Sequence, residues 1–531
     1  MILATAINQI RKWALSSLIL HSLFLTSIIS CNSQEARLNR ATKRLPFAIQ
    51  LGAYTKSRNG NNDNSDNCQA IAVDRYENIV CAGFTIGDMG EDGDGSSDIF
   101  IAKLDRYGRL LWITQLGNTT KEINGSNAGT DICGGLAIDE KGNIYCGGST
   151  DRLMDGDPVV RRNSISPRTA ADIDLDALVI KLKPDGKLDW VKQFGTSGAD
   201  ACNNIAVSKL GNIFCGNHTD SSIGTHTDNS TFEAFVPGAS NLYDPYIAKI
   251  TPSGSIVWIR QLGGSAITAP YSSEWGDRCA DISVDKDENA YCGGKTNGSL
   301  AEENGASTIV TPFNNGISDD IFVWSVDTNG NFRYLKQIGI ATVTSSPLLN
   351  DASGTELCSS ISSTPDGGVV CGGTSYSSFG DTFSGTADSL MIKLAPNAEV
   401  EWVLQMGLSN RPNPLNTSAE ECNDVITDSL GNAYCGGYTN GDSAEVSIGA
   451  SDILIYKVDQ DGLLLWDTQF GKHTEPINGS TSGSESCFSI NVDTSFNVYC
   501  AGTVNGSFAE QNGLIGSDAF MLRIDADGLF Y

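Results

Sequence analysis

The chain of 531 residues carries a formal net charge of −28 and has a pI of about 4.4. Such an acidic protein repels phosphate groups, which excludes nucleic acid as the main partner. Charged residues make up 18% and hydrophobic residues 40% of the chain, so the composition also excludes a disordered acidic tail. The 57 glycines and the short apolar runs between turn signals are typical of an all-β protein.

Residues 1–30 are expected to form a signal peptide. Arg11 and Lys12 precede an apolar run over residues 13–29, which is at the lower limit for crossing a bilayer and ends in small residues. The sequence Ile-Ile-Ser-Cys at residues 28–31 resembles the bacterial lipobox. This resemblance implies cleavage before Cys31 and acylation of its sulfur, and several acyl chains anchor a protein stably. The alternative is a plain secretory signal followed by a chance cysteine.

Residues 31–46 form a short basic segment between the expected lipid and the folded part. Arg37, Arg40, Lys43 and Arg44 stand against the lone Glu35. An attraction to anionic head groups and an ordinary flexible tether both account for this composition. The expected domains are therefore a signal peptide (1–30), a lipid-anchored basic tether (31–46) and one folded domain (47–531).

The other fourteen cysteines reveal a repeat. They form seven pairs, and twelve residues separate the two members of each pair. Successive pairs begin 64 to 79 residues apart. Such regularity predicts seven copies of one structural unit. The pairs are Cys68 with Cys81, Cys133 with Cys146, Cys202 with Cys215, Cys279 with Cys292, Cys358 with Cys371, Cys422 with Cys435, and Cys487 with Cys500.

Each unit is predicted to contain four antiparallel strands. In the second unit, strands over residues 136–138 and 144–148 flank an Asp-x-x-Gly-Asn turn, and strands over 176–182 and 188–195 flank a Pro-Asp-Gly turn. Seven such sheets bury both faces only when they pack radially, as in a β-propeller. A tryptophan recurs in the fourth strand, and we expect it to pack between sheets. It is present as Trp112, Trp190, Trp258, Trp402 and Trp466, and Tyr334 replaces it in the fourth unit.

The two ends of the folded part are predicted to share one sheet. The last unit stops at Tyr531, before its fourth strand, and residues 47–52 have the pattern of the missing strand, with Phe47 at the tryptophan position. The fold expected is therefore a seven-bladed propeller of four-stranded blades, closed by the N-terminal strand. Closing the ring in this way removes two exposed sheet edges.

Residues 205–207 with 211–214, and residues 138–139 with 142–145, resemble the bacterial seven-bladed β-propeller (SBBP) repeat. That repeat occurs in many exported proteins, including spirochaete lipoproteins. The resemblance implies the fold over nearly all of residues 47–531, and it brings no shared catalytic residues. The paired cysteines depart from the usual pattern, in which a small residue and a valine are more typical.

We expect all seven cysteine pairs to be disulfides within blades, because an exported protein is in an oxidising compartment. Each is expected to tie the entry of strand one to the exit of strand two. In an ideal hairpin Cys215 lies opposite Ile205, so the chain must bend near Cys202 for the two sulfurs to meet. Free, packed thiols are the alternative. Zinc is not expected, because the mature chain has only three histidines for seven cysteine pairs.

Loop lengths indicate where a partner binds. The turns between strands one and two and between strands three and four are uniformly short, whereas the long connections all fall at the opposite end of the blades, as over residues 150–174 and 219–241. Binding residues usually lie on loops held by a rigid scaffold, so we expect the loop end to be the interaction surface. Tolerated insertions are the alternative explanation of this variation.

Signals for catalysis and for cofactors are poor. No catalytic residues are assigned, because His218, His226 and His473 lie in unrelated contexts. Calcium is the best cofactor candidate, with Asp88, Asp92 and Asp94 on one acidic segment, but their spacing is not that of an EF-hand and a solvated acidic loop explains them equally.

The sequence hypothesis is an outer-membrane lipoprotein of the cell envelope, monomeric, facing the periplasm or the cell surface. It binds a protein or glycan partner through its loop end and acts as a scaffold or an adhesin. The alternative is an envelope enzyme acting on glycans or peptides, with a pair of carboxylates of raised pKa in the axial channel or on the loop end.

Overall fold

The computed structural model describes residues 47–51, 65–86, 89, 97–117, 130–151, 175–196, 198–220, 223, 243–262, 277–296, 319–339, 355–379, 385–407, 418–441, 451–471, 484–504 and 517–530. These residues form seven antiparallel sheets of four strands each. Among them no helix is long and apolar enough to cross a membrane.

The strands follow one another along the chain as consecutive blades. Blade 1 contains β2 (Asp66–Val73), β3 (Ile79–Thr85), β4 (Asp98–Leu104) and β5 (Leu110–Leu116). Blade 2 contains β6 (Asp131–Ile138), β7 (Ile144–Thr150), β8 (Asp176–Leu182) and β9 (Leu188–Phe194). Blade 3 contains β10 (Asn204–Val207), β11 (Ile213–Thr219), β12 (Asp244–Ile250) and β13 (Ile256–Gln261). Blade 4 contains β14 (Arg278–Val284), β15 (Ala290–Thr296), β16 (Asp320–Val326) and β17 (Phe332–Ile338).

The remaining three blades repeat this order. Blade 5 contains β18 (Glu356–Ser363), β19 (Val369–Ser375), β20 (Asp388–Leu394) and β21 (Val400–Met406). Blade 6 contains β22 (Glu420–Thr427), β23 (Ala433–Thr439), β24 (Asp452–Val458) and β25 (Leu464–Phe470). Blade 7 contains β26 (Glu485–Val492), β27 (Val498–Val504) and β28 (Asp518–Ile524), and its fourth strand is β1 (Phe47–Leu51).

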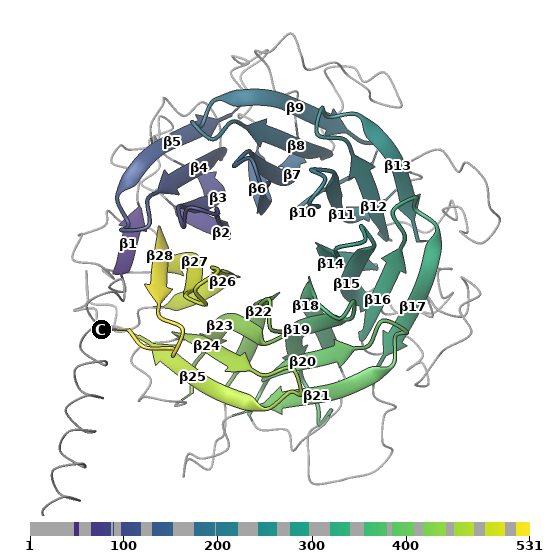
Figure 1. Ribbon diagram of the computed structural model, residues 1–531, viewed down its shortest axis with the longest axis vertical. Helices are drawn as coiled ribbons and strands as arrows, with labels where there is room; N and C mark the ends of the chain where they lie inside the picture. Colours follow the sequence, from purple (N-terminus) through teal and green to yellow (C-terminus); the bar gives the residue numbers. More distant parts are fainter. Residues whose placement is uncertain are drawn as a thin grey trace, which may run out of the picture. The chain divides into compact units, whose positions relative to one another are not determined.

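The seven sheets stand around a common axis, with the first strand of each blade innermost and the fourth on the perimeter (Figure 1). Strand β1 pairs with β28, and Phe47 lies opposite Arg523 just as Trp112 lies opposite Lys103 in blade 1. The predicted seven-bladed propeller and its closure by the N-terminal strand are therefore confirmed. Residues 47–530 form one compact unit that contains every strand of the ring.

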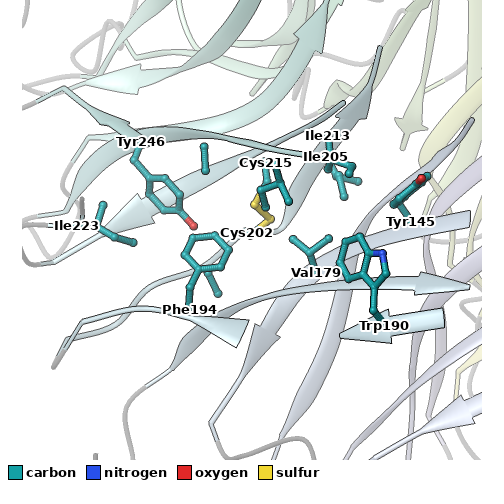
Figure 2. Packing of buried hydrophobic residues seen from close by; sticks show 13 residues of the cluster. Tyr145, Val179, Trp190, Phe194, Cys202, Ile205, Ile213, Cys215, Ile223 and Tyr246 are labelled. Atoms are coloured by element: carbon teal, nitrogen blue, oxygen red, sulfur yellow. A yellow bond between two sulfur atoms is a disulfide. The ribbon is translucent and has the colours of Figure 1, made fainter. Parts of the chain in front are cut away.

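The hydrophobic core lies between the blades rather than at one centre. In the cluster of Figure 2, Tyr145 and Val179 of blade 2 pack with Ile213 and Tyr246 of blade 3. Each of the seven core clusters joins neighbouring blades in this way, and one of them joins blade 7 to blade 1. The first and last blades are thus buried as completely as the others, which stabilises the closed ring.

The seven cysteine pairs are disulfides within the inner hairpins, as predicted. The bonds join Cys68 to Cys81, Cys133 to Cys146, Cys202 to Cys215, Cys279 to Cys292, Cys358 to Cys371, Cys422 to Cys435, and Cys487 to Cys500. The Cα atoms of the bonded cysteines are 5.5 to 5.9 Å apart, within the usual range.

The expected bend of the first strand is present in every blade. In six blades a β-bulge follows the first cysteine, as between Cys68 and Ala70, and blade 3 reaches the same result because β10 begins only after Cys202. The extra residue of the bulge shifts the first cysteine toward the second, so the two sulfurs can meet.

The expected place of the disulfides at the exit of the second strand is wrong. The second cysteine is the third residue of its seven-residue strand, and it is buried in every blade. These residues are Cys81, Cys146, Cys215, Cys292, Cys371, Cys435 and Cys500. The first cysteines are buried as well, because the bulge and the hairpin turn both sulfurs into the packed space between blades. The bridges therefore stabilise the core rather than the base of the long loops.

Two small residues follow the second cysteine of nearly every pair, and close contacts explain them. A Cβ atom at Gly148 would lie 1.9 Å from the carbonyl oxygen of Ile132 at the bulge of its own blade. A Cβ atom at Gly293 would lie 2.7 Å from Cys358 Sγ of the next blade. The Cys-Gly-Gly motif is therefore a packing requirement of the bulge and of the neighbouring disulfide.

The recurrent tryptophans join each blade to the next one along the chain, which confirms their predicted packing role. Trp402 donates an indole hydrogen bond to the carbonyl oxygen of Gln460 at 2.9 Å, and a Cβ atom at Gly462 in that turn would lie 2.7 Å from the indole ring. The turn glycine has a φ of 83°. Where Tyr334 replaces the tryptophan, Ala398 stands at the corresponding turn position of the next blade with a φ of 65°. The indole ring of a tryptophan is therefore accompanied by a glycine in the turn that it contacts.

The substitution Gly462→Ala is expected to lower the free energy of unfolding by about 2 kcal/mol, because a Cβ atom meets the Trp402 ring and a left-handed φ disfavours alanine. Denaturant unfolding measures the loss. The same substitution should cost less in a Trp402→Tyr background, which copies the pair of Tyr334 and Ala398. Equal costs in the two backgrounds would show that the ring does not require the glycine.

Candidate loop-end binding site

The register of the strands defines two different ends of the propeller. At one end short turns connect Val73 to Ile79 and Leu104 to Leu110, which are paired residues of adjacent strands. We call this end the turn face. At the other end, Thr85 pairs with both Asp66 and Asp98, and the long connections of every blade leave from these strand ends. We call it the loop end; most residues of the long connections lie outside the described residues.

A repeated network of buried polar groups fixes the strand ends at the loop end. In six blades the glutamine of the fourth strand donates an amide hydrogen bond to the aspartate that begins the third strand, as Gln469 does to Asp452 at 2.8 Å. A Cβ atom at Gly471 would lie 2.1 Å from Asp452 Oδ1, which explains the Gln-x-Gly motif. The described pairs are Gln115 with Asp98, Gln193 with Asp176, Gln261 with Asp244, Gln337 with Asp320, Gln405 with Asp388, and Gln469 with Asp452. Their recurrence confirms a scaffolding role.

A second acidic residue lies two positions before the first cysteine of every pair. In six blades its backbone N–H donates to the carbonyl oxygen of the residue before the neighbouring blade's aspartate, as Glu485 does to Ser451 at 3.1 Å. All seven are buried and lie at Asp66, Asp131, Asp200, Asp277, Glu356, Glu420 and Glu485. In several blades a hydroxyl donates to this carboxylate, as Thr439 does to Glu420 at 3.0 Å. The sequence analysis missed this sevenfold acidic position, although its constant spacing from the cysteines is visible in the sequence.

Blade 7 departs from this network. Val504 stands where blade 6 has Thr439, and neither carboxylate oxygen of the fully buried Glu485 has a hydrogen-bond partner among the described residues. Burial, together with the nearby Asp452 carboxylate, raises the pKa of Glu485 to about 8. Glu485 is therefore neutral in the folded protein at pH 7.

The substitution Glu485→Gln is expected to stabilise the protein by a few kcal/mol at pH 8 and to have little effect at pH 4. The unfolded chain releases the Glu485 proton near pH 4.5, whereas the folded chain keeps it up to about pH 8, so the stability of the wild type falls as the pH rises through this window. Denaturant unfolding at several pH values measures the difference.

Two exchanges provide matched controls. Val504→Thr supplies the missing hydroxyl and should weaken the pH dependence, and Thr439→Val should create the same dependence at Glu420 of blade 6. A wild type and a Glu485→Gln variant that lose stability in parallel between pH 5 and pH 8 would contradict this account.

Between the repeated acidic residue and the repeated cysteine lies a position that differs in every blade. Its partner across the inner hairpin varies as well. The two positions hold Asn67 and Phe84, Ile132 and Ser149, Ala201 and His218, Arg278 and Lys295, Leu357 and Thr374, Glu421 and Tyr438, and Ser486 and Thr503. A ring of unlike side chains thus lies within an otherwise sevenfold framework at the loop end.

The first group of these side chains is the blade 3–4 cluster, Asn217, His218, Tyr243 and Arg278. The His218 and Tyr243 ring centroids are 4.4 Å apart, and the Arg278 guanidinium lies 5.1 Å from the Tyr243 ring. Burial and the Arg278 charge lower the pKa of His218 to about 4, so its imidazole is neutral at physiological pH. Blade 3 also lacks the bulge and has Asn217 in place of the usual second glycine. The cluster therefore combines a cation, two aromatic rings and an amide, all partly exposed.

The second group is the blade 5–6 cluster, Tyr376, Glu421 and Tyr438. Tyr438 forms a hydrogen bond with Glu421, and burial together with that carboxylate raises the pKa of the Tyr438 hydroxyl. Burial and the Glu421 charge also raise the pKa of Tyr376. All three side chains are partly exposed. The loop end thus presents a cationic aromatic cluster and an anionic aromatic cluster above different blades.

A pair of carboxylates with raised pKa values lies on the inner strands. Ser360 Oγ is 2.8 Å from Asp281 Oδ2 and 2.6 Å from Asp424 Oδ1. The single hydroxyl proton of Ser360 can be donated to only one of the two carboxylates. The arrangement therefore favours a second proton on Asp281 or Asp424, which would complete the other hydrogen bond. Burial and the Asp424 charge accordingly raise the pKa of Asp281, and burial raises that of Asp424.

The surroundings of this pair indicate a structural role. Asp281 also accepts hydrogen bonds from the N–H groups of Ile282 and Ile361, and Asp424 accepts one from the N–H of Ile490 and one from Ser489. Every oxygen of the two carboxylates is engaged, and two of these bonds cap the free edges of neighbouring inner strands. The pair meets the pKa condition of the enzyme alternative but leaves no oxygen free for a substrate.

The other predicted site residues fall in two groups. The cysteine pairs are bonded as expected, but they span the middle of the inner hairpins and are buried there. Cys31, the calcium candidates Asp88, Asp92 and Asp94, and the histidines His226 and His473 lie outside the described residues. Within the described part of the chain, no group of three or more His, Cys, Asp or Glu residues is arranged to hold a metal ion.

The fold and the loop-end site define a repeat protein of the seven-bladed β-propeller class, braced by one disulfide in each blade. The beta-propeller repeat SBBP matches residues 111–152, 189–224, 257–301 and 401–443, so these four segments are SBBP repeats and the expected resemblance is confirmed. The matched segments run from the outer strand of one blade into the inner hairpin of the next. This offset is the one that closure by the N-terminal strand requires.

More distant similarities extend over larger parts of the chain. An uncharacterized WD repeat-containing protein of Acanthamoeba polyphaga mimivirus is 22% identical over 265 residues, which is 44% of this chain and 18% of that protein. The chain therefore spans less than a fifth of that relative. Among solved structures, a polysaccharide lyase is 10% identical over 91% of this chain and 100% of its own, with a TM-score of 0.41. The propeller domain of the Trilobed protease from Pyrococcus furiosus is 7% identical over 86% of this chain and 98% of its own, with a TM-score of 0.36.

Proposed function

We propose that this protein is an envelope lipoprotein that binds a protein or glycan partner at its loop end. The observation that carries the proposal is the ring of unlike side chains at the loop end. The first position of each pair lies between an acidic residue and a cysteine that are present and buried in all seven blades, so these two flanking residues serve the scaffold. A binding site is made of side chains that each occur once, rather than in every blade. The blade 3–4 and blade 5–6 clusters contain such side chains.

The chemistry of the two clusters suits a polar partner. A guanidinium beside aromatic rings recognises carboxylates and stacks on planar or apolar faces, and tyrosines contribute contact area at low entropic cost. Glu421 offers an acceptor over a different blade. A rigid, disulfide-braced scaffold loses little conformational entropy on binding, which favours a role as a binding scaffold or adhesin. The engaged carboxylates of Asp281 and Asp424 support binding over catalysis.

The partner should be retained by the immobilised propeller, residues 47–531, from envelope extracts or on a glycan array. The double substitution His218→Ala with Arg278→Ala is expected to weaken this binding by about tenfold or more with an unchanged melting temperature. Lys286→Ala, an exposed change on the turn face, is the matched control and should have no effect. If both variants retained the partner equally, the blade 3–4 cluster would not be part of the binding site.

We also propose that Cys31 carries the lipid that holds the protein in the envelope, with the outer membrane as its site. The lipobox-like residues 28–31 support this proposal. In a bacterial host, the wild-type chain should incorporate labelled palmitate and fractionate with membranes, and Cys31→Ser should lose the label. Labelling that persists in the Cys31→Ser variant would overturn the proposed anchor.

A further inference from the structure

The turn face carries the exposed apolar side chains of the propeller. Every large hydrophobic side chain exposed in the described part of the chain lies in a tight turn or within two residues of one. Tyr76, Tyr107 and Leu210 are 62%, 56% and 75% exposed at turn tips. The others are Leu110, Leu111, Val257, Val400, Leu430, Leu463, Leu464, Leu465, Leu529 and Phe530. Exposed apolar side chains gathered on one surface mark a contact with another apolar or amphipathic surface.

Blade 1 adds three arginines to this face. We call Arg75, Tyr76, Arg106, Tyr107 and Arg109 the basic turn patch; together with neighbouring turn residues they line a shallow hollow of about 460 Å³. The arginines lie over the tyrosine rings, with guanidinium-to-centroid distances of 4.8, 5.0 and 5.5 Å. Arg109 also pairs with Asp105 at 2.6 Å. No other blade has an arginine or a tyrosine at the corresponding turn positions.

The charge of the turn face is divided between two halves. At the turn tips of blades 1–4, seven exposed basic residues and the partly exposed Arg106 stand against three exposed acidic residues and four partly exposed ones. The exposed acidic residues are Glu140, Asp185 and Asp287, and the partly exposed ones are Glu77, Asp105, Asp139 and Asp327. The basic residues are Arg75, Arg106, Arg109, Lys141, Lys183, Lys187, Lys209 and Lys286. The exposed tips of blades 5–7 have no basic residue and carry Asp366, Glu399, Asp461 and Asp527. In a protein of net charge −28, a basic half-face is a local exception.

The chain joins the propeller at this same end. Strand β1 is antiparallel to β28, and Phe47 lies opposite Arg523, which is two residues before the turn that begins at Asp525. Phe47, the first residue that the structure describes, therefore lies at the turn-face end of β1. Ile49 and Leu51 of β1 pack against the core shared with blade 1, so the point of attachment is next to the blade that carries the basic turn patch.

We propose that the turn face over blades 1–4 docks on an anionic membrane surface, with the basic turn patch in contact with lipid phosphates. Arginines bind phosphate oxygens through paired N–H groups, and tyrosines prefer the depth of the head groups. Screening confines the attraction to charges within about 10 Å of the lipid, so the acidic remainder of the protein opposes docking only weakly. A soluble acidic polysaccharide would use the arginines but gives no role to Leu110, Leu111 and Leu210, the exposed leucines of blades 1–4.

This inference rests on the proposed function and adds an orientation to it. Docking through the turn face points the loop end away from the membrane, where it can meet a partner. It does not depend on which partner the loop end binds. A failure of vesicle binding with intact partner binding would overturn the docking alone, and loss of partner binding with intact vesicle binding would overturn the proposed function alone.

The test is sedimentation of the propeller, residues 47–531, with vesicles. This part contains the whole closed ring and lacks the apolar segment and the tether. The propeller should bind vesicles of phosphatidylcholine with phosphatidylglycerol and not vesicles of phosphatidylcholine alone, and binding should weaken as salt is added. Arg75→Gln with Arg106→Gln and Arg109→Gln should lower the partition coefficient by about tenfold or more.

Two further variants and a soluble acidic polymer test whether binding is specific to the basic turn patch and to lipid. Glu399→Gln with Asp461→Asn and Asp527→Asn changes as many charges on the other half of the turn face and should leave binding unchanged or stronger. Tyr76→Ser with Tyr107→Ser should weaken binding without changing its salt dependence. Unimpaired vesicle binding by the arginine variant would overturn the proposal, as would arginine-dependent binding to soluble polyglucuronate without any binding to vesicles.

Discussion

The structure depends on the contact between each blade and the next, which must work seven times around a closed ring. A single four-stranded sheet cannot bury both of its faces, so the buried apolar side chains of the described strands lie between blades. The contact is close: Cys358 Sγ lies 2.7 Å from where a Cβ atom of Gly293 would be. Close packing of this kind explains why the same small residues, disulfides and buried acidic residues recur in blade after blade.

Two departures from the repeat involve pairs of residues in contact that change together, and a third involves one residue alone. Blade 3 lacks the bulge and also lacks the glycine that the bulge requires. Tyr334 replaces a tryptophan, and Ala398 replaces the glycine expected beside it. Blade 7 is different, because Val504 replaces the hydroxyl while Glu485 is retained, which leaves a buried, neutral carboxyl group. The two matched changes preserve the packing between blades, and the unmatched one removes a hydrogen-bond donor.

The two ends of the propeller then have different tasks. Repeated residues define both ends, but the loop end adds unlike polar and aromatic side chains and the turn face adds exposed apolar residues with a basic half. In our proposals the loop end holds the partner and the turn face rests on lipid. The direction of β1 agrees with this division, because Phe47 lies at the turn-face end of the strand.

The sequence by itself determined the number of blades, the four strands of each, the cysteine pairs and the closure by residues 47–51, because each of these depends on a local pattern repeated seven times. Even the bend near Cys202 follows from counting residues around a hairpin. Only the tertiary structure decided which side chains of different blades meet. Arg278 and Tyr243, or Ser360 and Asp424, are 35 or more residues apart in the sequence and become neighbours through the packing of adjacent blades. The same holds for the turn face, since its arginines and leucines are scattered along the chain and gather at one end only when the sheets close into a ring.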